Sequence, residues 1–429
     1  MTAKLNDQKK KTMKHKQSFI RFSLSALLLA SLIFAMVSCV KEEAEMPQHI
    51  KVGVLLGFSG VGSQNATETQ AALEVGLDNI RALIRQNWLD VTIELVYKDT
   101  ESDPDLALNH AQALIDEGVR LIIGPYTSAE AMAVKELADQ HDVLVVSHSA
   151  VSTALAIPND NLLRFVPSDH YQAEALQAMM AADGLEAMVA VVRNDLWSNS
   201  LMEAVSEVFL SHGGEIIAQL PFEPDTEQFG ALAQEVVNEM ATGAAIYGEE
   251  HTGLYLISFA DGTPILEAVS AAGLSVGHKL YGASAYAQNA SLPANASAAS
   301  FAAETGIKVP VFGLDESAAN IYEPIQARIK EMIGTEANIY ALAAYDILKT
   351  AFLAHITQDP GVAFEEFKKH FIHTASSYFG ATGHTELDEN GDRMNVYYDF
   401  WTIIETAEGE YQWHLAAKYN TSTGLLSLY

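Results

Sequence analysis

The chain has 429 residues, of which 49% are apolar and 19% charged, and it contains a single cysteine. This length predicts two or three domains with packed cores, and one cysteine excludes a disulfide scaffold, a cysteine-rich zinc module and an iron–sulfur site. The net charge of −30 argues against binding to nucleic acid, which requires a basic surface.

The first forty residues have the pattern of a secretory signal. Seven of the 25 basic residues lie within the first 21 positions, and the uncharged stretch at residues 22–37 that follows them is shorter than a typical membrane-spanning helix. The stretch ends in Met-Val-Ser-Cys at residues 36–39, which resembles a bacterial lipobox, where a peptidase cuts before a cysteine that carries lipid. We therefore expect residues 1–38 to be a lipoprotein signal peptide and Cys39 to be lipidated.

Two further expectations concern this segment. Residues 39–49 have the charged composition of a short solvated tether. From Cys39 onward 18 basic and 54 acidic residues remain, so the domain itself has a net charge of −36. An uncleaved N-terminal anchor is the alternative to a cleaved signal, and both interpretations place the domain outside the cytoplasm, held at a bacterial membrane in the periplasm or at the cell surface.

The first part of the domain alternates strand and helix patterns. Short apolar runs bounded by glycine are typical of buried parallel strands, and apolar residues at helical spacing separate them. Asp103-Pro104 opens a helix with a capping side chain followed by proline. The predicted strands lie at residues 51–56, 91–96, 121–123 and 143–146, and the predicted helices lie around residues 73–84, 103–118 and 128–140.

The same alternation resumes after Pro167. Repeated strand–helix units of this kind predict an α/β fold, with parallel sheets covered by helices on both faces. Helices are predicted at residues 171–182, 201–210, 228–240, 264–272 and 340–354, and strands at residues 188–192, 215–218, 254–258, 395–404 and 411–418.

Enzyme signatures are mostly absent. The sequence has no phosphate-binding loop, no zinc-protease histidine pair and no serine nucleophile elbow. His148 stands between two serines at a strand end, but neighbouring strand residues point to opposite faces, so it is poorly placed to act as their base. His370 and His373 share a helix face beside two lysines, which favours a solvated surface over a metal site. We expect no catalytic activity, no metal and no cofactor.

Several loops that follow strands suit the capture of a small ligand, because ligands of open α/β sheets bind beyond the carboxyl ends of the strands. Ser128 is expected to cap the helix that it begins, and its hydroxyl and the nearby backbone N–H groups could receive a carboxylate. Alternatively, Ser128 only caps the helix and binds no ligand. Trp197 lies in the loop at residues 194–199 and could cover an apolar ligand, or it could be a core residue.

Six segments follow one another at residues 50–60, 98–105, 121–125, 145–155, 164–169 and 379–393. Their order resembles that of the leucine/isoleucine/valine-type periplasmic binding proteins of ABC transporters. The resemblance implies two Rossmann-like lobes joined by three hinge crossovers, the periplasmic binding protein type 1 fold, with a ligand in the cleft between the lobes. It implies a first lobe of residues 50–167 plus 311–393 and a second lobe of residues 168–310 plus 394–429.

The resemblance also assigns roles to individual residues. Ser128 falls on the carboxylate-binding serine of the family. Ser149 falls where a backbone carbonyl receives the ammonium group of the ligand, and Trp197 falls where an aromatic side chain covers the ligand.

Other positions depart from the family pattern. Val151 replaces a hydroxyl residue that binds the amino-acid head group, and Ser284 replaces an acid that pairs with the ammonium group. Asn65 and Gly262 stand where aromatic residues are common. Burial of an unpaired ammonium group would cost several kcal/mol, so we expect an altered ligand, amino-acid-like or a small carboxylate, bound by Ser128, Ser149, Trp197, Asn65 and Ser284.

These expectations together describe an extracytoplasmic substrate-binding lipoprotein of an ABC importer. Its partners would be a small-molecule ligand, an ABC permease and a membrane reached through the lipid on Cys39, and the protein would be a monomer that binds no nucleic acid. A ligand-sensing or protein-interaction domain of the same fold is the first alternative. An extracytoplasmic hydrolase is the second, and it lacks an evident nucleophile–base pair.

Overall fold

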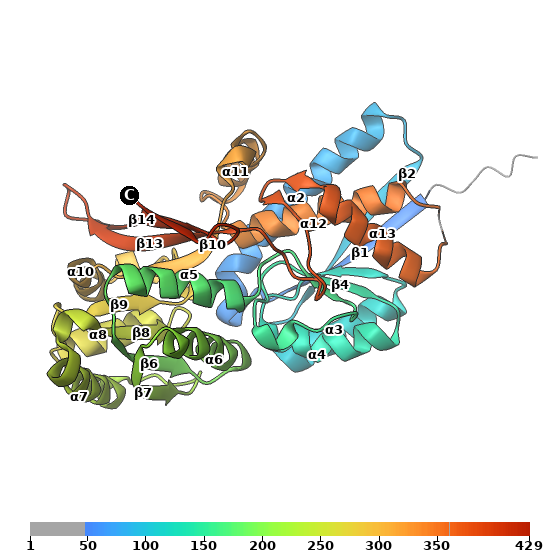
Figure 1. Cartoon of the computed structure of the whole chain (residues 1–429). Coiled ribbons are helices and arrows are strands. Elements are labelled where there is room, and N and C mark those ends of the chain that lie inside the picture. The colour runs from blue at the N-terminus through green and yellow to red at the C-terminus, as the bar shows by residue number, and fades with distance from the viewer. Residues whose placement is uncertain (1–47, 360) are drawn as a thin grey trace, which may run out of the picture. The chain divides into compact units, whose positions relative to one another are not determined.

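The computed structural model describes residues 48–359 and 361–429 (Figure 1). The predicted signal peptide and the lipidation site Cys39 lie outside the described residues, as does most of the predicted tether. From His49 to Tyr429 the chain forms one unit with two α/β lobes.

The first lobe is built on a five-stranded sheet with the order β2-β1-β3-β4-β5, in which β1, β3, β4 and β5 run parallel. Alternate residues of β1 are buried on opposite faces of this sheet: Val54 and Leu56 on one, Leu55 on the other. The strands are β1 (Gln48–Leu56), β2 (Val91–Asp99), β3 (Leu121–Ile123), β4 (Leu144–Ser147) and β5 (Leu162–Arg164).

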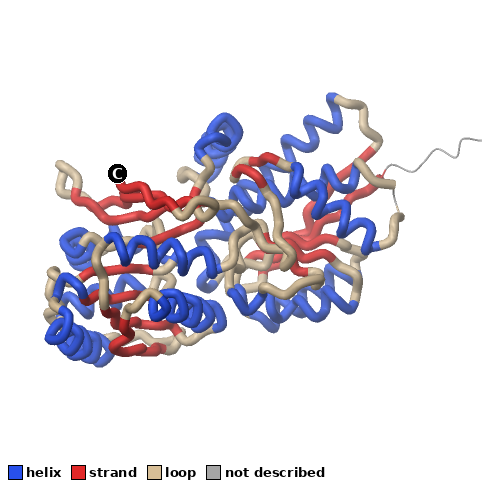
Figure 2. Tube along the Cα trace, in the orientation of Figure 1, coloured by secondary structure: helices blue, strands red, loops and turns tan. Residues whose placement is uncertain are grey.

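Helices cover both faces of this sheet (Figures 1 and 2). Leu114 and Val134 of α3 and α4 share a core with Leu55, whereas Leu73 and Ile347 of α2 and α12 share a core with Val54. Helix α12 is apolar and long enough to cross a membrane, but most of it is buried in this core. The helices of this lobe are α2 (Ser63–Gln86), α3 (Pro104–Asp116), α4 (Ser128–Gln140), α11 (Ala319–Ile333), α12 (Ile339–Ile356) and α13 (Phe364–Ser377), with 3-10 turns at Gly60–Gly62, Thr153–Leu155 and Glu316–Ala318.

The second lobe repeats this plan around a parallel sheet with the order β7-β6-β8-β9. Its strands are β6 (Ala187–Arg193), β7 (Glu215–Phe222), β8 (Thr252–Ile257) and β9 (Lys279–Gly282). Its helices are α5 (Asp169–Ala182), α6 (Leu196–Ser211), α7 (Gly230–Tyr247), α8 (Gly262–Ala271), α9 (Ser291–Ala294) and α10 (Ala296–Thr305), with 3-10 turns at Glu249–His251 and Ser284–Tyr286. The predicted α/β class with parallel sheets is therefore confirmed.

A third, antiparallel sheet with the order β10-β13-β14-β15 packs beside the second lobe and was not predicted as a sheet. The chain passes between the lobes three times: after β5, after β10 and before β13. The predicted change of lobe at residues 310 and 311 falls inside β10. The strands are β10 (Val309–Gly313), β13 (Tyr397–Glu405), β14 (Tyr411–Asn420) and β15 (Leu425–Leu428), and a small hairpin is formed by β11 (Phe379–Gly380) and β12 (Gly383–His384).

Two predictions about the starts of helices need correction, the cap of α4 and the loop at Trp197. Thr127 caps α4, and Ser128 is the first helical residue. The Thr127 hydroxyl accepts a hydrogen bond from the Glu130 N–H, while the Glu130 carboxylate accepts one from the Thr127 N–H. Trp197 lies in the first turn of α6 and not in a loop, because the Asp195 carboxylate accepts the Ser198 N–H at 2.8 Å and starts that helix early.

Candidate ligand-binding site

A cavity of about 380 Å³ lies where the carboxyl ends of strands from both lobes face each other. This volume is within the range of small-molecule sites. The first lobe contributes Gly60, Val61, Glu101, Ser102, Pro104, Tyr126, Thr127, Ser128, Ala129, Ser149, Val151 and Tyr340, and the second lobe contributes Arg193, Asp195, Trp197, Pro224, Phe259, Ser284 and Ala285.

Ser128 presents hydrogen-bond donors to this cavity. It is 2% exposed, and its hydroxyl oxygen accepts the Ser152 N–H at 3.2 Å. Because no acceptor among the described residues takes the Ser128 proton, the hydroxyl remains free to donate to a ligand. The backbone N–H groups of Ser128 and Ala129 belong to the first turn of α4, where a helix leaves its N–H groups unpaired and favours a negative charge.

Ser149 and Val151 follow β4 and lie beside Ser128 in the cavity wall. The Ser149 hydroxyl donates to the Tyr126 carbonyl oxygen at 2.8 Å. This bond holds the loop that precedes Ser128 and α4. Val151 is buried and presents only methyl groups. This wall therefore offers fewer polar groups to an amino-acid head group than a hydroxyl residue at position 151 would.

The second lobe contributes an aromatic wall. The Trp197 and Phe259 ring centroids are 5.0 Å apart, and Trp197 is 6% exposed. The Arg193 guanidinium lies 5.0 Å from the Phe259 centroid and is held between Asp195 at 3.3 Å and Asp261 at 3.1 Å. The aromatic wall suits the apolar body of a solute, and Arg193 is paired with two carboxylates rather than one.

Ser284 and Asn65 occupy different places around the cavity. Ser284 lines this cavity and also an adjoining one of about 530 Å³, and its N–H donates to the Gln172 side chain at 2.8 Å. Asn65 lines only the adjoining cavity. The structure thus brings Ser128, Ser149, Trp197 and Ser284 together around one space, with Asn65 next to it, and their contacts with a ligand stay a prediction. Gly262 lines neither cavity.

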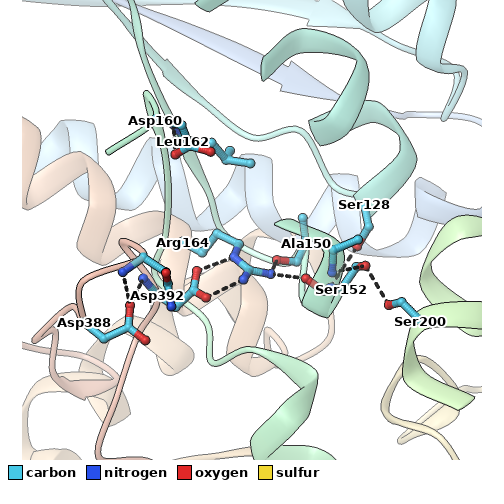
Figure 3. A network of polar contacts seen from close by, with 11 residues as sticks. Ser128, Ala150, Ser152, Asp160, Leu162, Arg164, Ser200, Asp388 and Asp392 are labelled. Atoms are coloured by element: carbon cyan, nitrogen blue, oxygen red, sulfur yellow. Dashed lines mark hydrogen bonds and ion pairs between the residues drawn. The ribbon is translucent and has the colours of Figure 1, made fainter. Parts of the chain in front are cut away.

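A buried polar network supports the loop that holds Ser128 (Figure 3). The Asp392 carboxylate binds the Arg164 guanidinium in a two-pronged ion pair, and Arg164 donates to the carbonyl oxygens of Ala150 and Ser152. The Ser152 hydroxyl lies 2.6 Å from the Ser200 hydroxyl of α6. Ser152 therefore contacts Ser128 of one lobe and the helix that carries Trp197 in the other.

His148 is buried behind the site and its protonation is coupled to stability. Burial lowers the pKa of His148 to about 3, and its Nε2 lies 3.2 Å from Asn65 Oδ1. The unfolded chain takes up this proton below pH 6.5 and the folded chain does not, so stability falls as the pH falls below 6.5.

We expect acidification to lower the stability of the protein through His148. Between pH 7 and pH 5 the wild-type free energy of unfolding should fall by about 2 kcal/mol more than that of His148→Gln. Urea unfolding at the two pH values measures the difference, and equal losses in the two proteins would contradict a neutral, buried His148.

Sequence reasoning missed several residues of the site. Arg193 and Phe259 stand at the ends of β6 and β8, so the rule that ligands bind beyond strand ends applied to them as well. Asn338 and Tyr340 lie at the start of α12, which belongs to the part of the chain that returns to the first lobe after β10. No local pattern in the sequence marks those two residues as neighbours of Ser284.

Sequence comparisons match most of the chain to known proteins. Residues 49–357 match the sequence profile of the family described as periplasmic binding protein. An uncharacterised protein of Methanocaldococcus jannaschii is 23% identical over 401 residues, which is 88% of this chain and 91% of that protein.

Solved structures share the fold. A branched-chain amino acid transporter substrate-binding protein of Streptococcus pneumoniae, in complex with isoleucine, has a TM-score of 0.69 at 18% identity and covers 86% of this chain and 99% of its own. A solute-binding protein of an ABC transporter from Rhodopseudomonas palustris, in complex with 3,4-dihydroxybenzoic acid, has a TM-score of 0.69 at 18% identity and covers 87% of this chain and 98% of its own.

Proposed function

Because the chain belongs to the periplasmic binding protein family, we propose that it captures a small carboxylate solute in the cavity between its lobes and delivers it to an ABC permease. The family and the fold neighbours are solute-binding proteins and not enzymes, which disfavours a hydrolase.

One observation carries the proposal. The unpaired donors of Ser128 and the first turn of α4 lie in the same cavity as Trp197 and Phe259 of the second lobe. A solute with a carboxylate at one end and an apolar body would therefore contact both lobes at once. Contact with both lobes is what a hinged binding protein needs to hold its closed form. The solute-bound neighbours from Streptococcus and Rhodopseudomonas carry ligands that each contain a carboxylate and an apolar part.

The site of action is also part of the proposal. A basic head, a short apolar stretch and a single cysteine at position 39 support export and attachment to a bacterial membrane through lipid. A net charge of −36 from Cys39 onward would keep the domain away from an anionic membrane surface. We propose transport as the role rather than sensing, since the two solute-bound structural neighbours are described as parts of transporters.

A thermal-shift screen of amino acids, their amides and organic acids tests the proposal. A ligand present at 100 times its Kd should stabilise the protein by about 2.7 kcal/mol, which raises the unfolding temperature. We expect one or a few carboxylates to do so, and their uncharged amides to fail.

Variants identify the site behind each hit. Ser128→Ala should remove the shift given by a carboxylate, because it deletes the free hydroxyl donor. Ser206→Ala is the matched control, since among the described residues the Ser206 hydroxyl bonds only within α6, to the Met202 carbonyl oxygen. A carboxylate that shifts Ser128→Ala as strongly as wild type would place its binding elsewhere and overturn the proposal.

A further inference from the structure

The cavity between the lobes continues into a second chamber with a different chemical character. The two cavities share nine lining residues, among them Tyr126, Arg193 and Ser284, so they form one continuous space. The second chamber, of about 530 Å³, adds five carboxamide side chains: Gln64, Asn65 and Asn338 from the first lobe and Gln288 and Asn289 from the second.

Several of these amides keep unused hydrogen-bonding groups. Asn338 uses its Oδ1 to accept bonds from Asn65 Nδ2 and the Ala341 N–H, and its own Nδ2 donates to no partner among the described residues. Gln64 donates to Glu68, and its Oε1 accepts nothing within the described chain. The Gln288 side chain has no such bond to a described residue. The chamber therefore offers both hydrogen-bond donors and hydrogen-bond acceptors from neutral side chains.

One cation, Arg193, and three carboxylates, Glu101, Asp195 and Asp261, line the two cavities. Asp195 and Asp261 both pair with Arg193, and Glu101 is exposed to solvent. No acid lies at position 284, where Ser284 lines both cavities and marks their junction. A ligand ammonium group beside Ser284 would therefore meet a hydroxyl at that position and not a carboxylate.

We propose that the solute is an N-acylated amino acid, with its carboxylate at Ser128, its apolar side chain against Trp197 and its acyl amide in the second chamber. This inference rests on the proposed function and names the ligand class. Acylation makes the α-nitrogen neutral, which fits a serine at position 284. It also extends the ligand from that nitrogen into the space lined by carboxamides, whose free N–H and C=O groups match an amide.

Three probes test the acyl group and the carboxylate separately. They are leucine, N-acetyl-leucine and N-acetyl-leucinamide, each titrated into the protein by calorimetry. N-acetyl-leucine should bind at least tenfold more tightly than leucine. N-acetyl-leucinamide, which keeps the acyl group but lacks the carboxylate, should bind at least tenfold more weakly than N-acetyl-leucine.

A variant of the second chamber tests the contact itself. Asn338→Ser keeps a side chain that can cap α12 but removes the free Nδ2 donors, and it should weaken N-acetyl-leucine about tenfold. Gln288→Ala, at an exposed position without a bond to lose, should also weaken it. Asn238→Ser, on the exposed side of α7, is the matched control and should change nothing. Thermal unfolding of each variant verifies that it is folded.

The outcomes distinguish the inference from the proposed function. The inference is overturned if leucine binds as tightly as N-acetyl-leucine, or if N-acetyl-leucine does not bind. The proposed function still holds in either case if the wider screen finds another carboxylate whose binding depends on Ser128. Unchanged affinity for N-acetyl-leucine in both Asn338→Ser and Gln288→Ala overturns the second chamber as its site. Equal binding of N-acetyl-leucine and N-acetyl-leucinamide removes the carboxylate from recognition and so contradicts the proposed function.

Discussion

Replacing Arg164 by methionine is expected to lower the free energy of unfolding by about 3–5 kcal/mol. Arg164 is fully buried and pairs with Asp392, which is 1% exposed. Removing the guanidinium leaves a buried carboxylate without its counter-charge and leaves the carbonyl oxygens of Ala150 and Ser152 without their donor. The loss of this support should also weaken solute binding, because Ser152 holds Ser128.

Chemical denaturation of three variants tests this expectation. Arg328→Met is the matched control: its ion pair with Glu331 is exposed, so it should cost less than about 1 kcal/mol. Arg164→Met combined with Asp392→Leu should cost less than Arg164→Met alone, because no unpaired charge remains buried. A loss below 1 kcal/mol for Arg164→Met would show that the pair does not support the loop.

Trp197→Ala is expected to reduce affinity for the best carboxylate of the screen by about 30-fold or more, because a buried aromatic contact at the centre of a site carries a large share of binding energy. Trp197 packs against Phe259 and forms the second-lobe wall of the cavity. Calorimetric titration measures the change.

Two substitutions control for lost stability. Trp197→Phe keeps an aromatic ring in the same pocket and should retain most of the affinity. Trp88→Ala, at a position that is 93% exposed, should leave affinity unchanged. Full affinity in a folded Trp197→Ala protein would remove Trp197 from the site.

Much of the fold could be predicted because its signals are local. Buried parallel strands appear as short apolar runs, and the predicted helix at residues 128–140 coincides with α4. Asp103 caps α3 as its sequence suggested, accepting the Leu106 N–H at 2.9 Å. The pairing of β10 with β13 joins segments about ninety residues apart, and no local pattern encodes such a partner.

The site was predictable to the extent that strand ends position it. Ser128, Ser149 and Trp197 all follow strands, and they line one cavity. The cap of α4 was assigned to Ser128 instead of Thr127 because both residues suit that position, and only the bond from Glu130 decides between them. The ion pair of Arg164 could not be predicted from the sequence, because its partner Asp392 lies 228 residues away.

The central claim is that a small carboxylate solute binds between the lobes, and a crystal structure of the protein with the tightest ligand of the screen tests it most directly. The account predicts electron density for the ligand carboxylate at the Ser128 hydroxyl and the first turn of α4, with the apolar part of the ligand against Trp197. A ligand bound elsewhere on the domain, with the cavity at Ser128 free of it, would contradict the account.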